Sequence, residues 1–100
     1  MNKDTLNKVI KFRNDRGWEK DHTPKNLAIS ISLEANELLE NFQWDDSKFV
    51  VNNNRENIKE EIADVLIYCI SLLDKLDMDF DNVILEKLDK NKIKYPINSK

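Results

Sequence analysis

The scarcity of helix-breaking residues is the feature that most constrains how this chain folds. One glycine and two prolines occur in 100 residues. Apolar side chains recur at i, i+3 and i+4, with no long alternating run, and strands fit this pattern poorly. The sequence therefore predicts one all-α domain over residues 1–100, built as a four-helix bundle.

Start and stop signals divide the chain into four helical segments. The predicted helices cover about residues 4–15, 23–42, 54–76 and 80–92, with a polar connection over residues 43–53. Thr23 is a good N-cap residue and Pro24 suits the first helical position, so the second helix has the clearest beginning. Asn54 is the predicted cap of the third helix.

Charge and cysteine content exclude several classes of function. The net charge of −3 gives no electrostatic reason to expect binding to nucleic acid or to an anionic membrane. The single cysteine, Cys69, cannot form an intramolecular disulfide and lies in an apolar stripe, which predicts a small core residue. No apolar run approaches the roughly 18 residues of a membrane span. The expected location is the cytoplasm.

Two acidic pairs lie at the margins of apolar helical stripes. Glu34 and Glu37 border the stripe of the second predicted helix, and Glu61 and Asp64 border that of the third. Carboxylates that converge near an apolar interface repel one another and need protons or cations. Oxygen ligands favour Mg²⁺ or Mn²⁺ over Zn²⁺. An acidic i, i+3 pair is most often only a solvated face, and periodicity alone leaves both interpretations open.

The spacing of these acids resembles a known signature. Glu34 and Glu37, followed by Glu61 and Asp64, are similar to the ExxE…ExxD pattern of MazG-like all-α nucleoside triphosphate pyrophosphohydrolases. Six ordered segments add a likeness to the dCTP pyrophosphatase subgroup: Phe12-Arg13, Trp18, His22 to Leu27, Leu39 to Trp44, Asp64 to Tyr68, and Lys87 with Asn91 and Tyr95-Pro96.

This resemblance implies a fold, a reaction and an assembly. The implied fold is a four-helix core, assembled as a homodimer or a dimer of dimers. The implied reaction is Mg²⁺-dependent conversion of a (d)NTP, first of all dCTP or a modified dCTP, to its monophosphate and pyrophosphate. House-cleaning of aberrant nucleotides and control of pool size both fit such a reaction.

The resemblance also implies roles for particular side chains. Glu34, Glu37, Glu61 and Asp64 match the metal ligands, and one of them or a neighbour would orient the attacking water. Trp18, His22, Trp44 and Tyr68 match positions that enclose the nucleobase, with His22 or Asn26 at its edge. Lys87 and Asn91 match a pattern expected to hold the phosphate chain. Without the resemblance, Trp44 and Tyr68 are equally read as interface or core aromatics, and His22 as a helix-entry residue.

Some features depart from the family pattern or suit other functions. Asn36 replaces a small residue, and the terminal basic residues are lysines where relatives often have arginines, which bears on base preference. A carboxylate-bridged di-iron bundle needs two Glu-x-x-His motifs, and His22 is the only histidine. A non-catalytic helical interaction or nucleotide-binding regulatory module is the remaining alternative. Ile29, Leu33 and Ile67 are predicted to face a partner subunit.

Overall fold

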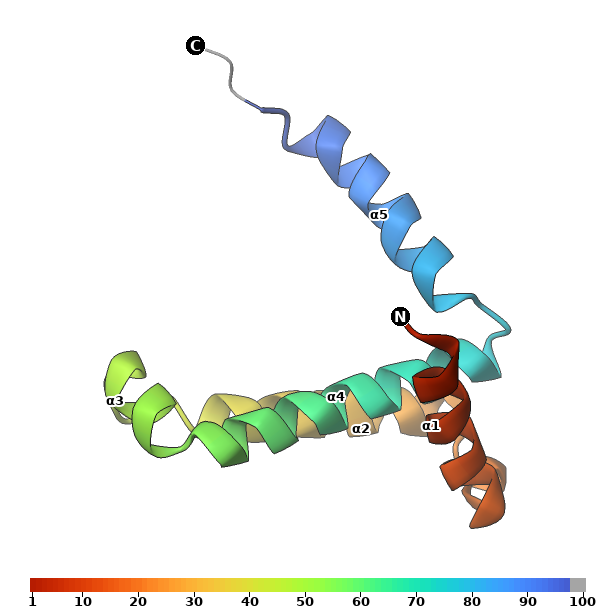
Figure 1. Cartoon of the computed structure of the whole chain (residues 1–100), viewed down its shortest axis with the longest axis horizontal. Coiled ribbons are helices and arrows are strands. Elements are labelled where there is room, and N and C mark those ends of the chain that lie inside the picture. The colour runs from red at the N-terminus through yellow and green to blue at the C-terminus, as the bar shows by residue number, and fades with distance from the viewer. Residues whose placement is uncertain (98–100) are drawn as a thin grey trace.

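The computed structural model describes residues 1–97, and the regular secondary structure in that range is all helical. Its elements are α1 (Lys3–Asp15), the 3₁₀ turn η1 (Trp18–Lys20), α2 (Pro24–Glu40), α3 (Ser47–Asn53), α4 (Arg55–Lys75) and α5 (Phe80–Lys94). α2 and α4 lie antiparallel, α1 crosses one end of this pair, and α3 lies at the other end (Figure 1). The all-α prediction is confirmed for the described residues.

Local capping explains where the helices begin. Thr23 Oγ1 accepts a hydrogen bond from the backbone N–H of Asn26 at 3.1 Å, with Pro24 in the first turn, as predicted. Asn54 occupies the N-cap position of α4, but its side chain makes no capping bond. Gly17 has φ of 67°, the left-handed conformation that glycine adopts without steric cost, and this turns the chain from α1 into η1.

A small core joins α2, α3 and α4. Leu27 and Val50 are essentially inaccessible to solvent and Ile70 is buried. The apolar stripe of α4 is only partly covered, because Ile62, Leu66 and Leu76 are each more than 40% exposed.

A buried arginine ties α1 to the end of α4. The Arg13 side chain is only 5% exposed, and its Nη2 lies 2.6 Å from Asp74 Oδ2. Its Nη1 also donates to the Ser71 carbonyl at 3.4 Å. Desolvating a guanidinium is costly unless its donors are paired, so this contact fixes how α1 docks.

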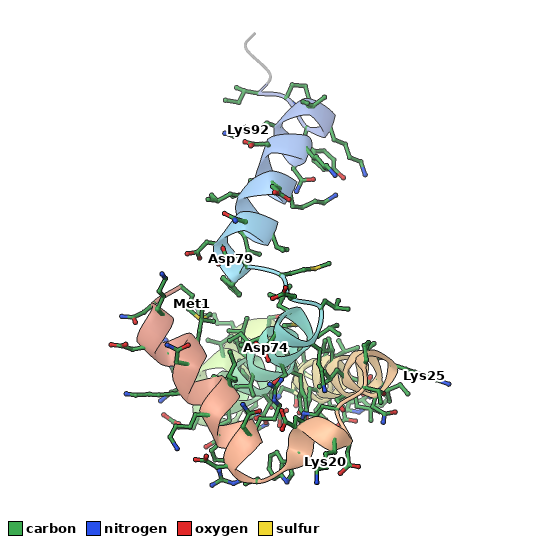
Figure 2. All side chains as sticks on the ribbon, turned by 90° about the vertical axis from the view of Figure 1, so that its right-hand side faces the viewer. Met1, Lys20, Lys25, Asp74, Asp79 and Lys92 are labelled. Atoms are coloured by element: carbon green, nitrogen blue, oxygen red, sulfur yellow. The ribbon has the colours of Figure 1, made fainter. Side chains whose placement is uncertain are left out.

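The predicted four-helix bundle needs two corrections. A fifth α-helix, α3, forms at residues 47–53, where a polar connection was predicted. Asp46 caps it by accepting from the Lys48 N–H at 2.8 Å, and Val50 buries its side chain. In addition, α5 extends away from the packed helices instead of completing a bundle with them (Figures 1 and 2).

The helices of residues 1–97 include none with both the length and the apolarity needed to span a bilayer.

Candidate metal and nucleotide site

The antiparallel packing of α2 and α4 brings the predicted acidic residues face to face. Glu34 comes from the middle of α2, and Glu61 and Asp64 come from the first half of α4. One carboxylate oxygen from each of the three lies within 4.8 Å of the other two. The i, i+3 spacing on α4 places Glu61 and Asp64 on the same face of the helix, which is why one helix supplies two of the three groups.

Two of these carboxylates have oxygens that are buried without a partner. Among the described residues, Glu34 Oε2 and Glu61 Oε2 are inaccessible to solvent and accept no hydrogen bond. Buried polar atoms are nearly always paired in folded proteins, so each unpaired oxygen requires an explanation. A cation between the helices would supply the missing partner for both.

The protonation of Glu34 reflects the same lack of a partner. Burial raises its pKa to about 7, and the nearby carboxyl of Glu37 and the negative charges of Asp64 and Glu61 act in the same direction. The pKa of Glu61 is also raised, first by burial and then by Glu37 and Asp64. A proton or a bound cation would relieve the repulsion among these carboxylates.

Glu37 lies at the edge of this cluster. It is outside the set of three whose oxygens converge, but it shares a pocket of about 360 Å³ with Glu61. The pocket is lined by Glu37, Glu40, Asn41, Trp44, Asp45, Asn54, Asn57 and Glu61. A hard divalent ion fits the donor set of carboxylate oxygens, since Mg²⁺ is usually bound by a few carboxylates together with waters and substrate phosphates. Glu34, Glu61 and Asp64 would hold it, with Glu37 beside them.

An aromatic cluster lies next to the carboxylates. The ring centroids of Trp18 and His22 are 6.1 Å apart, and those of His22 and Tyr68 are 6.2 Å apart. Tyr68 follows Asp64 by one turn of α4, and both line a largely apolar pocket of about 390 Å³ together with Phe12. Aromatic faces beside a cation site offer a surface on which a planar base can stack.

The surroundings of His22 in this cluster lower its pKa and so favour the neutral imidazole. Its pKa is lowered, first by burial and then by the positive charges of Arg13 and Lys75, while Asp21 opposes the shift. His22 Nδ1 is buried and makes no hydrogen bond within the described part of the chain. A neutral imidazole with a free ring nitrogen can exchange one hydrogen bond with a ligand.

Comparison with known proteins identifies the family to which this site belongs. The sequence model of the MazG-like family matches residues 29–100, most of the chain and all four acidic positions. The chain belongs to the MazG-like family. It is 33% identical to rat dCTP pyrophosphatase 1 over 92 residues, covering 87% of this chain and 54% of that protein. Human dCTP pyrophosphatase 1 is 34% identical over 90 residues, covering 85% and 53%. The chain thus spans about half the length of these curated relatives.

A solved structure extends the likeness to the whole fold. The crystal structure of a pyrophosphatase from Archaeoglobus fulgidus superposes with a TM-score of 0.87 at 46% sequence identity. The match covers 94% of this chain and 91% of that one. The likeness in fold therefore extends over nearly the full length of both chains.

Three of the predicted nucleotide-binding residues do not join the others within one MazG-like chain. Trp44 is 85% exposed in the connection between α2 and α3, at the opposite end of the helix pair from η1. Lys87 and Asn91 lie on α5, which extends away from the carboxylates (Figure 1). Asn26 is at the start of α2, where its Nδ2 donates to the Asp21 carbonyl at 3.0 Å and closes the loop before the helix.

The structure also shows contacts that the sequence did not reveal. Arg13, noted only for its likeness to the family, pairs with Asp74 in the interior. Asn41 and Asn57 join α2 to α4 through an Asn57 Nδ2 to Asn41 Oδ1 hydrogen bond of 2.8 Å. The available signals were their position, four residues after Glu37 and four before Glu61, and the place of Asn41 in the family-like segment Leu39 to Trp44.

Proposed function

We propose that this MazG-like chain is a magnesium-dependent pyrophosphohydrolase that converts a nucleoside triphosphate to its monophosphate and pyrophosphate. The observation that carries the proposal is the convergence of Glu34, Glu61 and Asp64, two of them with buried oxygens that have no partner. Mn²⁺ is the alternative ion, because it takes similar oxygen ligands.

The names of the relatives indicate the substrate class. Proteins called dCTP pyrophosphatase 1 share about one third of the residues, so dCTP or a modified dCTP is the first substrate to test. A bound magnesium ion would neutralise triphosphate oxygens and the charge that develops during phosphoryl transfer. The chain itself supplies carboxylates that hold the ion, and one of these or a neighbour orients the attacking water.

The aromatic cluster is the proposed nucleobase site. The rings of Trp18, His22 and Tyr68 lie one after another in space beside the carboxylates. A base stacked there places its triphosphate toward Asp64. The neutral imidazole of His22 is suited to hydrogen-bond the edge of the base. Asn26, at the start of α2, is the second candidate for this contact. A cytosine edge offers both a donor and an acceptor to such groups.

The remaining predicted residues lead us to propose a homo-oligomer, either a dimer or a tetramer. In the single chain, Leu33 on α2 is 60% exposed, and α5 presents Leu85 and Leu88 at 58% and 49%. Figure 2 shows that α5 rises clear of the other helices. Apolar faces of this extent mark association surfaces. A second copy would cover them and bring its own Lys87 and Asn91 toward the carboxylates of the first.

The test is release of pyrophosphate from a panel of dNTPs and NTPs, with Mg²⁺, with Mn²⁺ and with EDTA. The proposal expects metal-dependent formation of monophosphate and pyrophosphate, with dCTP or a modified dCTP turned over fastest. Absence of turnover for every nucleotide by folded protein in ample Mg²⁺ would favour the non-catalytic module instead. The single cysteine gives no sign of an oxidising compartment, so the cytoplasm is the proposed location, and removal of aberrant nucleotides is the proposed role.

A further inference from the structure

The hydrogen bond between Asn41 and Asn57 lies one helical turn beyond the carboxylates. Asn41 follows Glu37 by four residues on α2, and Asn57 precedes Glu61 by four on α4, so each lies on the face of its helix that carries an acid. All four side chains line the same pocket of about 360 Å³. The two amides are 2.8 Å apart from Nδ2 to Oδ1.

Asn41 is anchored on its own helix as well as across the pair. Its Nδ2 lies 3.4 Å from the carbonyl oxygens of Glu37 and Leu38, which are among the last carbonyls of α2, and the Leu38 carbonyl also accepts from the Asn41 backbone N–H at 3.3 Å. Its Oδ1 is therefore turned toward Asn57. The amide bridge connects the backbone of Glu37 with the helix that carries Glu61.

This bridge has a different effect on the helix pair from the acids beside it. Glu34, Glu37, Glu61 and Asp64 push α2 and α4 apart when they are charged and no cation is bound. The amide pair is neutral and attractive, and it joins the same two helices at the adjacent turn. It therefore limits how far the helices separate at the end of the cluster where Glu37 and Glu61 lie.

We propose that Asn41 and Asn57 are positioning residues whose amide bridge fixes the separation of α2 and α4 at the carboxylate cluster and so favours Mg²⁺ over Ca²⁺. The proposal rests on the magnesium site described under the proposed function. Mg²⁺ requires oxygens at roughly 2.0–2.1 Å in near-octahedral geometry, whereas Ca²⁺ accepts roughly 2.3–2.6 Å and irregular coordination. If α2 and α4 were free to separate, the cluster would lose affinity for Mg²⁺ more than affinity for Ca²⁺.

The test measures metal binding alone, without nucleotide. Dissociation constants for Mg²⁺ and for Ca²⁺ are determined by calorimetric titration of the wild type, Asn57→Ala, Asn41→Leu and the double variant. The matched control is Asn53→Ala, because the Asn53 side chain donates only to the Phe49 carbonyl of its own helix, at 2.7 Å. Two single variants at opposite ends of the bridge guard against the failure of one to fold.

The expected result is a change in selectivity and not only in stability. Loss of one hydrogen bond predicts Mg²⁺ binding weakened about fivefold in Asn57→Ala and in Asn41→Leu, with Ca²⁺ binding much less affected and no further loss in the double variant. Asn53→Ala should match the wild type. A merely structural bridge would lower the melting temperature and leave the ratio of the two constants unchanged, and that result would overturn the assignment.

The outcomes separate this inference from the proposed function. A wild-type chain that binds Mg²⁺ while both variants bind it equally well contradicts only the role of the bridge. A wild-type chain that binds neither cation contradicts the magnesium site itself, and the positioning role fails with it.

Discussion

The raised pKa of Glu34 makes the proposed magnesium affinity depend on pH. Mg²⁺ binds the ionised carboxylate, so the proton that Glu34 holds in the metal-free chain must leave before the ion is bound. With a pKa of about 7, Glu34 is roughly nine-tenths protonated at pH 6 and roughly one-tenth protonated at pH 8. The apparent dissociation constant for Mg²⁺ should therefore be about tenfold higher at pH 6 than at pH 8.

The sign of the effect on stability follows from the same shift. The pKa of Glu34 rises from 4.5 in the unfolded chain to about 7 on folding, so between these values the folded chain holds a proton that the unfolded chain has lost. The metal-free protein should consequently become less stable as the pH rises from about 4.5 to 7. Saturating Mg²⁺ should reverse this loss, because it replaces the proton with a cation.

Calorimetric titration with Mg²⁺ at pH 6 and pH 8 measures this dependence. Repeating it in two buffers of different ionisation enthalpy counts the protons released. Glu34→Gln should bind Mg²⁺ more weakly and with a flatter pH dependence. Glu60→Gln, which changes an exposed acid next to Glu61, should behave as the wild type. Equal dissociation constants at the two pH values in the wild type would refute the reasoning.

Three further predictions concern the interior, the assembly and the base site. Arg13→Met should lower the free energy of unfolding by about 1.5–3 kcal/mol in chemical denaturation. The control Lys11→Met, which breaks an exposed i, i+4 pair, should lower it by only about 0.3–0.5 kcal/mol. Equal losses in the two variants would contradict the docking role of Arg13. If each site of a dimer combines Glu61 of one chain with Lys87 of the other, Glu61→Gln and Lys87→Ala should each be nearly inactive alone. Co-expression of the two variants should then restore about a quarter of wild-type turnover. No recovery would reject site sharing. Trp44→Ala should raise KM for the nucleotide several-fold with an unchanged melting temperature, and an unchanged KM would remove Trp44 from the base site.

Much of the fold follows from local patterns in the sequence. The Thr23-Pro24 start of α2 was predicted because capping depends on neighbouring residues alone. The helix at residues 47–53 was missed because its polar composition resembles a loop, and only its cap and the burial of Val50 against the other helices stabilise it. Periodicity located the apolar stripe of α4, but it does not say whether the same chain or another copy covers Ile62 and Leu66.

The candidate site was predictable to a similar extent. The i, i+3 spacing and the family resemblance selected Glu34, Glu61 and Asp64, and antiparallel packing brings them together. The bridge between Asn41 and Asn57, which are 16 residues apart in sequence, depends on the register of α2 against α4, which no local pattern specifies. The roles of all these residues remain predictions that the experiments above address.

Turnover of dCTP in the presence of Mg²⁺, compared between the wild type and Asp64→Asn, tests the central claim most directly. The substitution removes one charge from an exposed ligand position and should leave the fold intact, as circular dichroism would verify. Removal of a metal ligand should then reduce pyrophosphate release at least about 100-fold, and EDTA should abolish release by the wild type. Equal turnover by the folded variant and the wild type would contradict the assignment of these carboxylates as the magnesium site.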